Sequence, residues 1–168
     1  MAHAYKELFS RAGLESFAKT SGGTGLHLYV PAGKKYHYEQ IRALGHDMSV
    51  LVHQALPKLT TLERSLGKRG TKIYLDYLQN SKGQTIAGVY CLRPRPGAPV
   101  SMPVHWREVK PGLDPRSFHI HNVLPRIKKI APLFTGIFGK GFDLKKTRKI
   151  LGIESIDQTD RDRLNKLL

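Results

Sequence analysis

Apolar residues recur with a helical period over one long segment of the chain, Tyr38 to Ala55. They are spaced three or four positions apart and therefore share one face: Ile41, Leu44, Met48, Leu51, Val52 and Ala55. The opposite face carries Arg42, His46 and His53, which we expect to be solvated. Pro57 follows and ends the segment, because proline cannot continue a helix. The pattern predicts an amphipathic helix whose apolar face packs on a sheet.

Two extended runs and a short helix precede this segment. Residues 4–13 (AYKELFSRAG) have the composition of a helix that a glycine ends. Residues 15–20 and Leu26–Val30 are predicted strands, and the loop S-G-G-T-G lies between them. The order predicts a β-hairpin with Ser21 at the entrance of its loop and His27 just inside the second strand.

Three later runs also have strand-like composition, at residues 72–78, 85–92 and 118–123. In the first of them, K-I-Y-L-D-Y-L, alternation places Asp76 on the same face as a tyrosine and a leucine. A carboxylate there would cost several kcal/mol if it were buried without a partner. We therefore expect Asp76 to lie at a strand end, to pair with a base or to hold a metal ion.

The last part of the chain is predicted to be mainly helical. Short helices are expected around Trp106, over residues 124–130 and over residues 144–151, the last capped by Asp143. Thr159 and Asp162 resemble a capping pair for one more helix. The elements together predict a single α/β (α+β) domain over residues 1–168, with a mixed or antiparallel sheet, packed helices and a basic helical tail at residues 129–168.

Charge is the unusual feature of the composition. The chain has 28 Lys and Arg residues against 13 Asp and Glu, a net charge of +15. Such an excess favours a polyanionic partner, nucleic acid or nucleotide, although a solubility charge or an acidic partner protein would also account for it. No apolar run approaches the ~20 residues that a membrane-spanning helix needs. The single cysteine excludes an internal disulfide and fits a reducing cytosol.

The segment T-S-G-G-T-G-L-H, residues 20–27, is the first candidate for chemistry. Glycines allow the backbone to approach a phosphate and to expose successive N–H groups to it. Ser21 adds a hydroxyl donor, and His27 adds a donor that can become cationic beside phosphate. The segment is not a P-loop, because no lysine and hydroxyl residue follow the last glycine. A tight glycine-rich turn without a ligand is the alternative.

A strand carboxylate and an arginine-rich loop are the other candidates. Asp76 is a suitable hard ligand for Mg²⁺ or Mn²⁺, although an ion pair with Arg69 or Lys72 would explain it equally well. Arg93 and Arg95 lie in the loop R-P-R-P-G-A-P, which proline stiffens. The planar fork of arginine suits a triphosphate, and a plain surface loop is the alternative.

Taken together, these segments resemble one family. The matching motifs are K-T-S-G-G-T-G-L-H at 19–27, E-R-S at 63–65, I-Y-L-D-Y-L-Q-N at 73–80 and L-R-P-R-P-G-A-P-V-S at 92–101. In order and spacing they resemble the polymerase domain of bacterial DNA ligase D, which belongs to the archaeo-eukaryotic primase superfamily. The resemblance covers residues 14–128, the C-terminal part of that domain.

The resemblance implies roles for individual residues. Ser21 and His27 match the motif that binds the phosphates of the incoming nucleotide, and Arg93 matches a triphosphate-binding arginine. Asp76 matches a catalytic carboxylate of the Mg²⁺ or Mn²⁺ site. Further positions near the nucleotide or the DNA are Arg69, Gln79 and Arg95. The implied function is template-dependent nucleotide addition at DNA ends in non-homologous end joining, in the bacterial cytoplasm and at the nucleoid.

The chain departs from the family pattern at the first metal-binding motif. That motif is an Asp-x-Asp pair upstream of the glycine loop, and residues 1–13 contain none. The pair Asp160 and Asp162 lies in the predicted last helix, where the two side chains would point about 200° apart. We therefore expect the chain alone to polymerise poorly and to need a ligase module or an upstream fragment in trans. The alternative is a non-catalytic nucleotide- or nucleic-acid-binding module.

Overall fold

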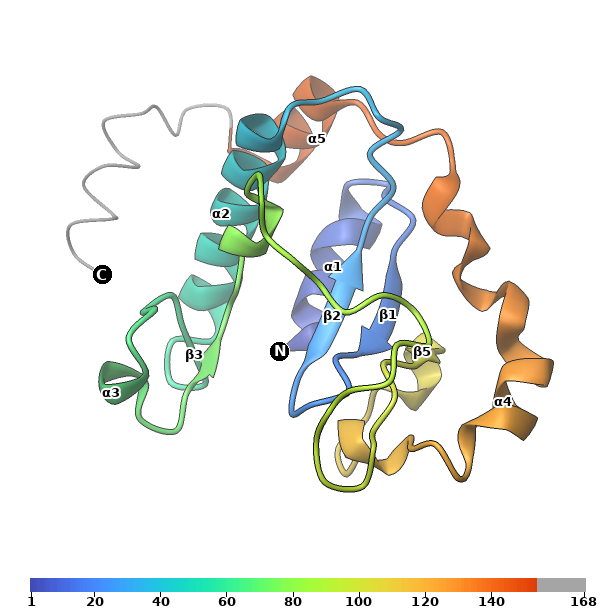
Figure 1. Ribbon diagram of the computed structural model, residues 1–168. Helices are drawn as coiled ribbons and strands as arrows, with labels where there is room; N and C mark the ends of the chain where they lie inside the picture. The colour runs from blue at the N-terminus through green and yellow to red at the C-terminus, as the bar shows by residue number, and fades with distance from the viewer. Residues whose placement is uncertain (154–168) are drawn as a thin grey trace.

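The first third of the chain folds as the apolar pattern predicts, in a computed structural model that describes residues 1–153. Helix α1 (Ala2–Arg11) leads into a hairpin of β1 (Phe17–Thr20) and β2 (Leu26–Tyr29). Helix α2 (Tyr38–Ala55) has the predicted bounds. In Figure 1, α1 lies behind the hairpin and α2 stands to one side of it.

The strands form two small sheets, one antiparallel and one parallel. Strand β5 (Pro103–Val104) pairs with β1, so the antiparallel sheet has the order β2-β1-β5. Strands β3 (Thr60–Thr61) and β4 (Ile73–Tyr74) pair in parallel as a separate sheet. The predicted mixed α/β class is confirmed, with its strands divided between two sheets. Helix α2 packs against α1 and β3.

The remaining elements are short helices and 3-10 turns. They are α3 (Leu66–Arg69), η1 (Leu78–Asn80), η2 (Trp106–Glu108), η3 (Pro115–Ser117), α4 (Val123–Ile130), η4 (Ala131–Phe138) and α5 (Leu144–Leu151). The Asp143 carboxylate accepts a hydrogen bond of 2.8 Å from the Lys146 amide, which confirms the predicted cap of α5. The Asp160–Asp162 pair and the predicted last helix lie outside the described residues. None of the helices described combines the length and apolar character needed to cross a bilayer.

Three predicted strands are shorter than expected or do not form. Residues 85–92 have no strand and only an isolated bridge between Leu92 and Val100. Tyr90 has a φ of 63°, which a strand cannot contain. Residues 118–123 make only one bridge. The run at 72–78 is reduced to β4, because its ladder with β3 ends there and residue 78 begins η1.

The largest core cluster lies where α1, α2 and α5 meet. Its buried residues are Phe9, Ala12, Leu14, Leu44, Met48, Leu151 and Ile153. Beside it, the fully buried carboxylate of Asp47 accepts a hydrogen bond of 2.5 Å from Arg148 and ties α2 to α5. His46 is also buried and packs edge-on against Tyr77, so its predicted exposure was wrong. The polar face of α2 is therefore partly covered by α5 and by the segment after β4.

Candidate functional site

A cavity of about 270 Å³ lies between the glycine hairpin and the long segment that connects η1 with β5. In Figure 1 this segment crosses in front of the hairpin. Five of the predicted site residues line the cavity: Ser21, His27, Gln79, Arg93 and Arg95. The rest of its wall consists of Gly23, Thr24, Thr85, Ile86 and Ala87. Residues more than 70 positions apart in sequence thus share one polar hollow.

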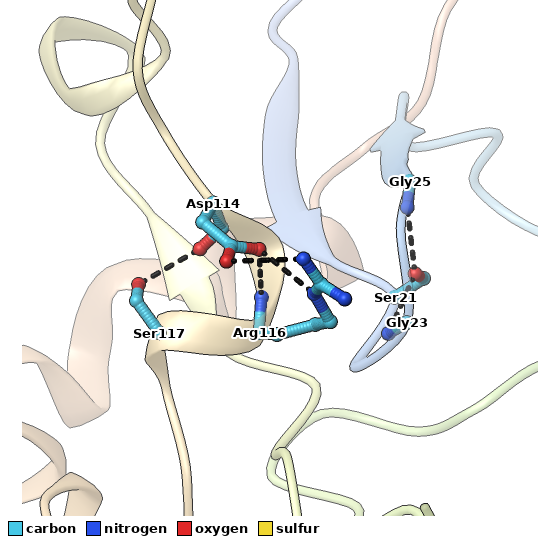
Figure 2. A network of polar contacts seen from close by, with 6 residues as sticks. All are labelled: Ser21, Gly23, Gly25, Asp114, Arg116 and Ser117. Carbon is cyan, nitrogen blue, oxygen red and sulfur yellow. Dashed lines mark hydrogen bonds and ion pairs between the residues drawn. The ribbon is translucent and has the colours of Figure 1, made fainter. Parts of the chain in front are cut away.

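The glycine loop is braced by the side chain of Ser21. Figure 2 shows the Ser21 hydroxyl oxygen accepting hydrogen bonds from the amides of Gly23 and Gly25, at 3.0 and 3.1 Å. The Ser21 amide in turn donates to the Gly25 carbonyl at 2.9 Å. Two N–H groups that the sequence offered to an anion are therefore directed at Ser21. Because its oxygen accepts both bonds, the hydroxyl proton stays available as a donor to a ligand.

Arg93 reaches the cavity across the second residue of this loop. Gly22 has a φ of +67°, and a Cβ built on it would lie 2.5 Å from Cγ of Arg93. One guanidinium nitrogen of Arg93 donates to the Ser21 carbonyl at 3.3 Å. Only glycine allows both the backbone conformation and this close approach. Gly22 therefore allows Arg93 to pack directly against the glycine loop.

His27 is half-buried, and its Nδ1 lies 3.0 Å from Nζ of Lys19. Burial, followed by the positive charges of Lys19 and Arg93, lowers the pKa of His27 to about 4. Burial likewise lowers the pKa of Lys19 to about 8, still above neutral pH. The imidazole is therefore neutral at physiological pH in the free protein, whereas the sequence had suggested a residue that becomes cationic.

Two predicted site residues are not among those that line the cavity. Asp76 is exposed and lies two positions beyond the end of β4. Within residues 1–153 no ion pair joins Asp76 to either Arg69 or Lys72. The Arg69 guanidinium donates to the carbonyls of Glu63 and Arg64 and stacks over a tyrosine ring. Arg69 thus holds the E-R-S segment in place.

The described residues do not by themselves form a metal site. Among residues 1–153, no three His, Cys, Asp or Glu side chains converge in a way that could hold an ion. Asp76 is the one predicted ligand, and a single exposed carboxylate binds a divalent ion weakly because Mg²⁺ and Mn²⁺ require several oxygen ligands.

The sequence interpretation missed several residues at the cavity. Thr85, Ile86 and Ala87 were assigned to a strand, so their place in the wall was not foreseen. The most informative omission is Lys19, whose residue exposure is 0% although its ammonium contacts His27. A signal was present, because a lysine in the short strand F-A-K-T directly precedes the glycine loop. A lysine is almost never fully buried unless it is paired, so a lysine inside a predicted strand is a candidate for a specific partner.

The chain has relatives among known proteins. Residues 1–134 match the family model of the LigD primase-polymerase domain. The chain is 37% identical over 129 residues to the bifunctional non-homologous end joining protein LigD of Bacillus subtilis. It is 30% identical over 124 residues to the multifunctional LigD of Pseudomonas aeruginosa. These alignments cover 76% and 74% of the chain, but only 21% and 15% of the two relatives.

A solved structure shares the fold. The polymerase domain from Mycobacterium tuberculosis ligase D, determined in complex with DNA, superimposes with a TM-score of 0.75 at 30% identity. The match covers 84% of this chain and 49% of that domain. The chain thus spans about half of the solved polymerase domain and between 15% and 21% of the two curated relatives. With the family model matching most of its length, the chain belongs to the LigD primase-polymerase domain family.

Proposed function

We propose that the cavity binds the phosphate tail of a nucleoside triphosphate, as part of a domain that adds nucleotides to DNA ends during non-homologous end joining. The observation that carries the proposal is the convergence of Ser21, His27 and Arg93 on one cavity. These are the residues to which the resemblance assigned phosphate binding. Arg95 and Gln79 line the same cavity and can extend the contact toward the nucleotide or the template.

The polar groups of the cavity suit an anion rather than a neutral ligand. Arg93 and Arg95 bring positive charge to the cavity, and none of the lining residues in the described part of the chain carries a carboxylate. Arg93 uses one nitrogen for the Ser21 carbonyl and has further N–H groups for phosphate oxygens. The Ser21 hydroxyl and the His27 ring supply neutral donors. Charge-assisted bonds from arginine to phosphate supply most of the affinity in this assignment.

Nucleotidyl transfer requires more than this cavity. The family uses a divalent metal ion and nucleotides, and we assign Asp76 to the metal site. Because Asp76 needs further carboxylates, we propose that residues 1–168 alone bind nucleotide but transfer it slowly. Another polypeptide segment, in cis or in trans, would then supply the remaining ligands. DNA is the proposed second substrate, in keeping with the net charge of +15 and the DNA-bound relative, and the proposed location is the bacterial cytoplasm.

The binding proposal is tested with Arg93→Ala. Calorimetric titration of the 168-residue chain with a nucleoside triphosphate should give an affinity about tenfold weaker for this variant, because a charge-assisted hydrogen bond contributes about 1.5 kcal/mol. Arg11→Ala, an exposed arginine at the end of α1, is the matched control and should bind as the parent chain does. Equal affinity in Arg93→Ala, or no binding by the parent chain, would contradict the proposal.

An activity assay distinguishes the proposed nucleotidyl transfer from the alternative, a non-catalytic binding module. Template-dependent nucleotide addition by the purified chain with Mn²⁺ should be barely measurable, and a polypeptide carrying an Asp-x-Asp motif should restore it. Asp76→Asn should abolish the restored activity and leave triphosphate binding unchanged without metal. Rapid extension by the chain alone would refute the need for a second segment. Failure of every supplied segment would favour the binding module.

A further inference from the structure

A lysine that lies outside the cavity wall contacts the histidine that lies inside it. We propose that Lys19 is a positioning residue, which fixes His27 in the tautomer with its proton on Nε2 and so turns a neutral N–H donor toward the nucleotide phosphates. This inference rests on the proposed function, since it assigns the way in which one residue of that site acts. It needs no further ligand or cofactor.

The first support is the burial and bonding of Lys19. The residue is 0% exposed, and within residues 1–153 no ion pair involves it. Its Nζ lies 2.5 Å from Oγ of Ser101, 3.0 Å from Nδ1 of His27 and 3.5 Å from the Thr20 carbonyl oxygen. An ammonium group has three protons and no lone pair, so three acceptors around it match its charged form. The site is therefore built to hold a cation without a counter-ion.

Ser101 fixes the orientation of the Lys19 ammonium group. Its hydroxyl donates to the Thr20 carbonyl at 2.7 Å, so its oxygen presents a lone pair to Lys19. Ser101 is itself 0% exposed, and it lies one residue before the Met102 carbonyl that accepts from the Thr20 amide. The hydrogen bonds that Ser101 and its neighbour Met102 form with Thr20 therefore hold the Ser101 hydroxyl in place. Lys19 consequently has one orientation, with its third close partner being the His27 ring.

The bonding of Lys19 decides the tautomer of His27. An ammonium can only donate, so the Nδ1 atom beside it must carry a lone pair. A neutral imidazole then has its proton on Nε2. The depressed pKa of His27 excludes protonation of both nitrogens near neutral pH. Within the described residues no hydrogen bond engages Nε2, and the ring lines the cavity, so Nε2–H is the group that His27 can offer to a phosphate oxygen.

A buried charge beside the cavity has a second effect. After burial, the positive charge of Arg93 lowers the pKa of Lys19 further, and Cys91 acts in the opposite direction. Lys19 does not line the cavity and cannot touch the ligand directly. Its hydrogen bonds can therefore reach the ligand only through His27, while its charge adds to the positive field of the cavity. This separates Lys19 from Arg93, which acts on the ligand by direct contact.

The tautomer is measured by long-range ¹H–¹⁵N NMR of the histidine rings in the unliganded chain at neutral pH. The signals of His27 are identified among eight histidines by their loss in His27→Gln. We expect the pattern of a proton on Nε2 in the parent chain and an averaged, two-tautomer pattern in Lys19→Met. Ser101→Ala, which removes the acceptor of Lys19 but keeps the charge, should give an intermediate result if Lys19→Met does not fold.

Triphosphate titration gives the second readout. Lys19→Met should bind more weakly than the parent chain but by less than His27→Ala, because an averaged ring still offers Nε2–H part of the time. In the His27→Ala background, Lys19→Met should have a smaller effect than in the parent chain, because part of its effect acts through His27. Lys145→Met, an exposed lysine on α5, is the control for loss of charge and should leave both readouts unchanged. A proton on Nδ1 in the parent chain, or full affinity in a folded Lys19→Met, would overturn the inference. Absence of triphosphate binding in the parent chain would instead refute the proposed function, since the tautomer is measured without ligand.

Discussion

Replacement of Asp47 by asparagine is expected to lower the free energy of unfolding by about 3 kcal/mol. Removal of one partner from a buried ion pair costs about 3–5 kcal/mol, because the other charge is left without compensation. The Asp47 side chain is 0% exposed and that of Arg148 is 18% exposed, so the lower end of this range applies. Chemical denaturation of the parent chain and the variant would measure the loss.

An exposed ion pair supplies the control for this variant. Asp114 and Arg116 are 3.3 Å apart, but their side chains are 50% and 64% exposed. Figure 2 shows this pair at the surface turn that Asp114 also caps. Solvent screens such a pair, so Asp114→Asn should shift the unfolding midpoint much less than Asp47→Asn. Similar shifts for the two variants would mean that burial does not determine the contribution of Asp47.

Gly22→Ala is expected to weaken both the fold and the binding of a triphosphate. A non-glycine residue in the left-handed region costs roughly 1–2 kcal/mol. The new methyl group would also meet Cγ of Arg93 at 2.5 Å and the Ser101 amide at 3.1 Å. Arg93 would have to leave the loop, so the affinity should decrease at least as much as in Arg93→Ala. Thermal unfolding and calorimetric titration of the same sample measure the two effects.

The matched control lies three residues further along the same loop. A Cβ at Gly25 would meet only Ser21 Oγ, at an ordinary contact distance of 3.9 Å, and Gly25 has no positive φ. Its amide would still donate to Ser21 in an alanine variant. Gly25→Ala should therefore bind triphosphate nearly as the parent chain does. Equal losses in the two variants would show that general loop flexibility, rather than the approach of Arg93, controls binding.

The predictions that the structure confirms depend on neighbours in sequence. The hairpin around the glycine loop, helix α2 and the Asp143 cap each follow from the order of a few residues, and each forms as predicted. Local propensity, periodicity and capping all favour one structure in these segments. The resemblance added what local patterns could not, by grouping the glycine loop, Arg93 and Asp76 around one phosphate tail. The loop and Arg93, 72 positions after Ser21, do line one cavity, whereas Asp76 is not among its lining residues.

The errors arise where distant contacts decide the structure. Residues 85–92 have strand-like composition, yet they have no continuous strand to pair with, and Ile86 and Leu92 remain exposed. His46 was expected in solvent because helical periodicity does not reveal that the segment after β4 returns to cover it. The burial of Lys19 depends on Ser101, 82 positions away. The spacing of residues in the sequence does not show which distant residues will come into contact.

The brace that Ser21 forms across the glycine loop affects how a ligand would be captured. Three hydrogen bonds between Ser21 and the next four residues already define the loop in the free protein. A flexible glycine segment would lose conformational entropy on binding, and that loss would weaken the complex. Here most of the ordering is complete before the phosphates arrive. Association should therefore be governed by diffusion and charge attraction, with little contribution from a slow rearrangement of the loop.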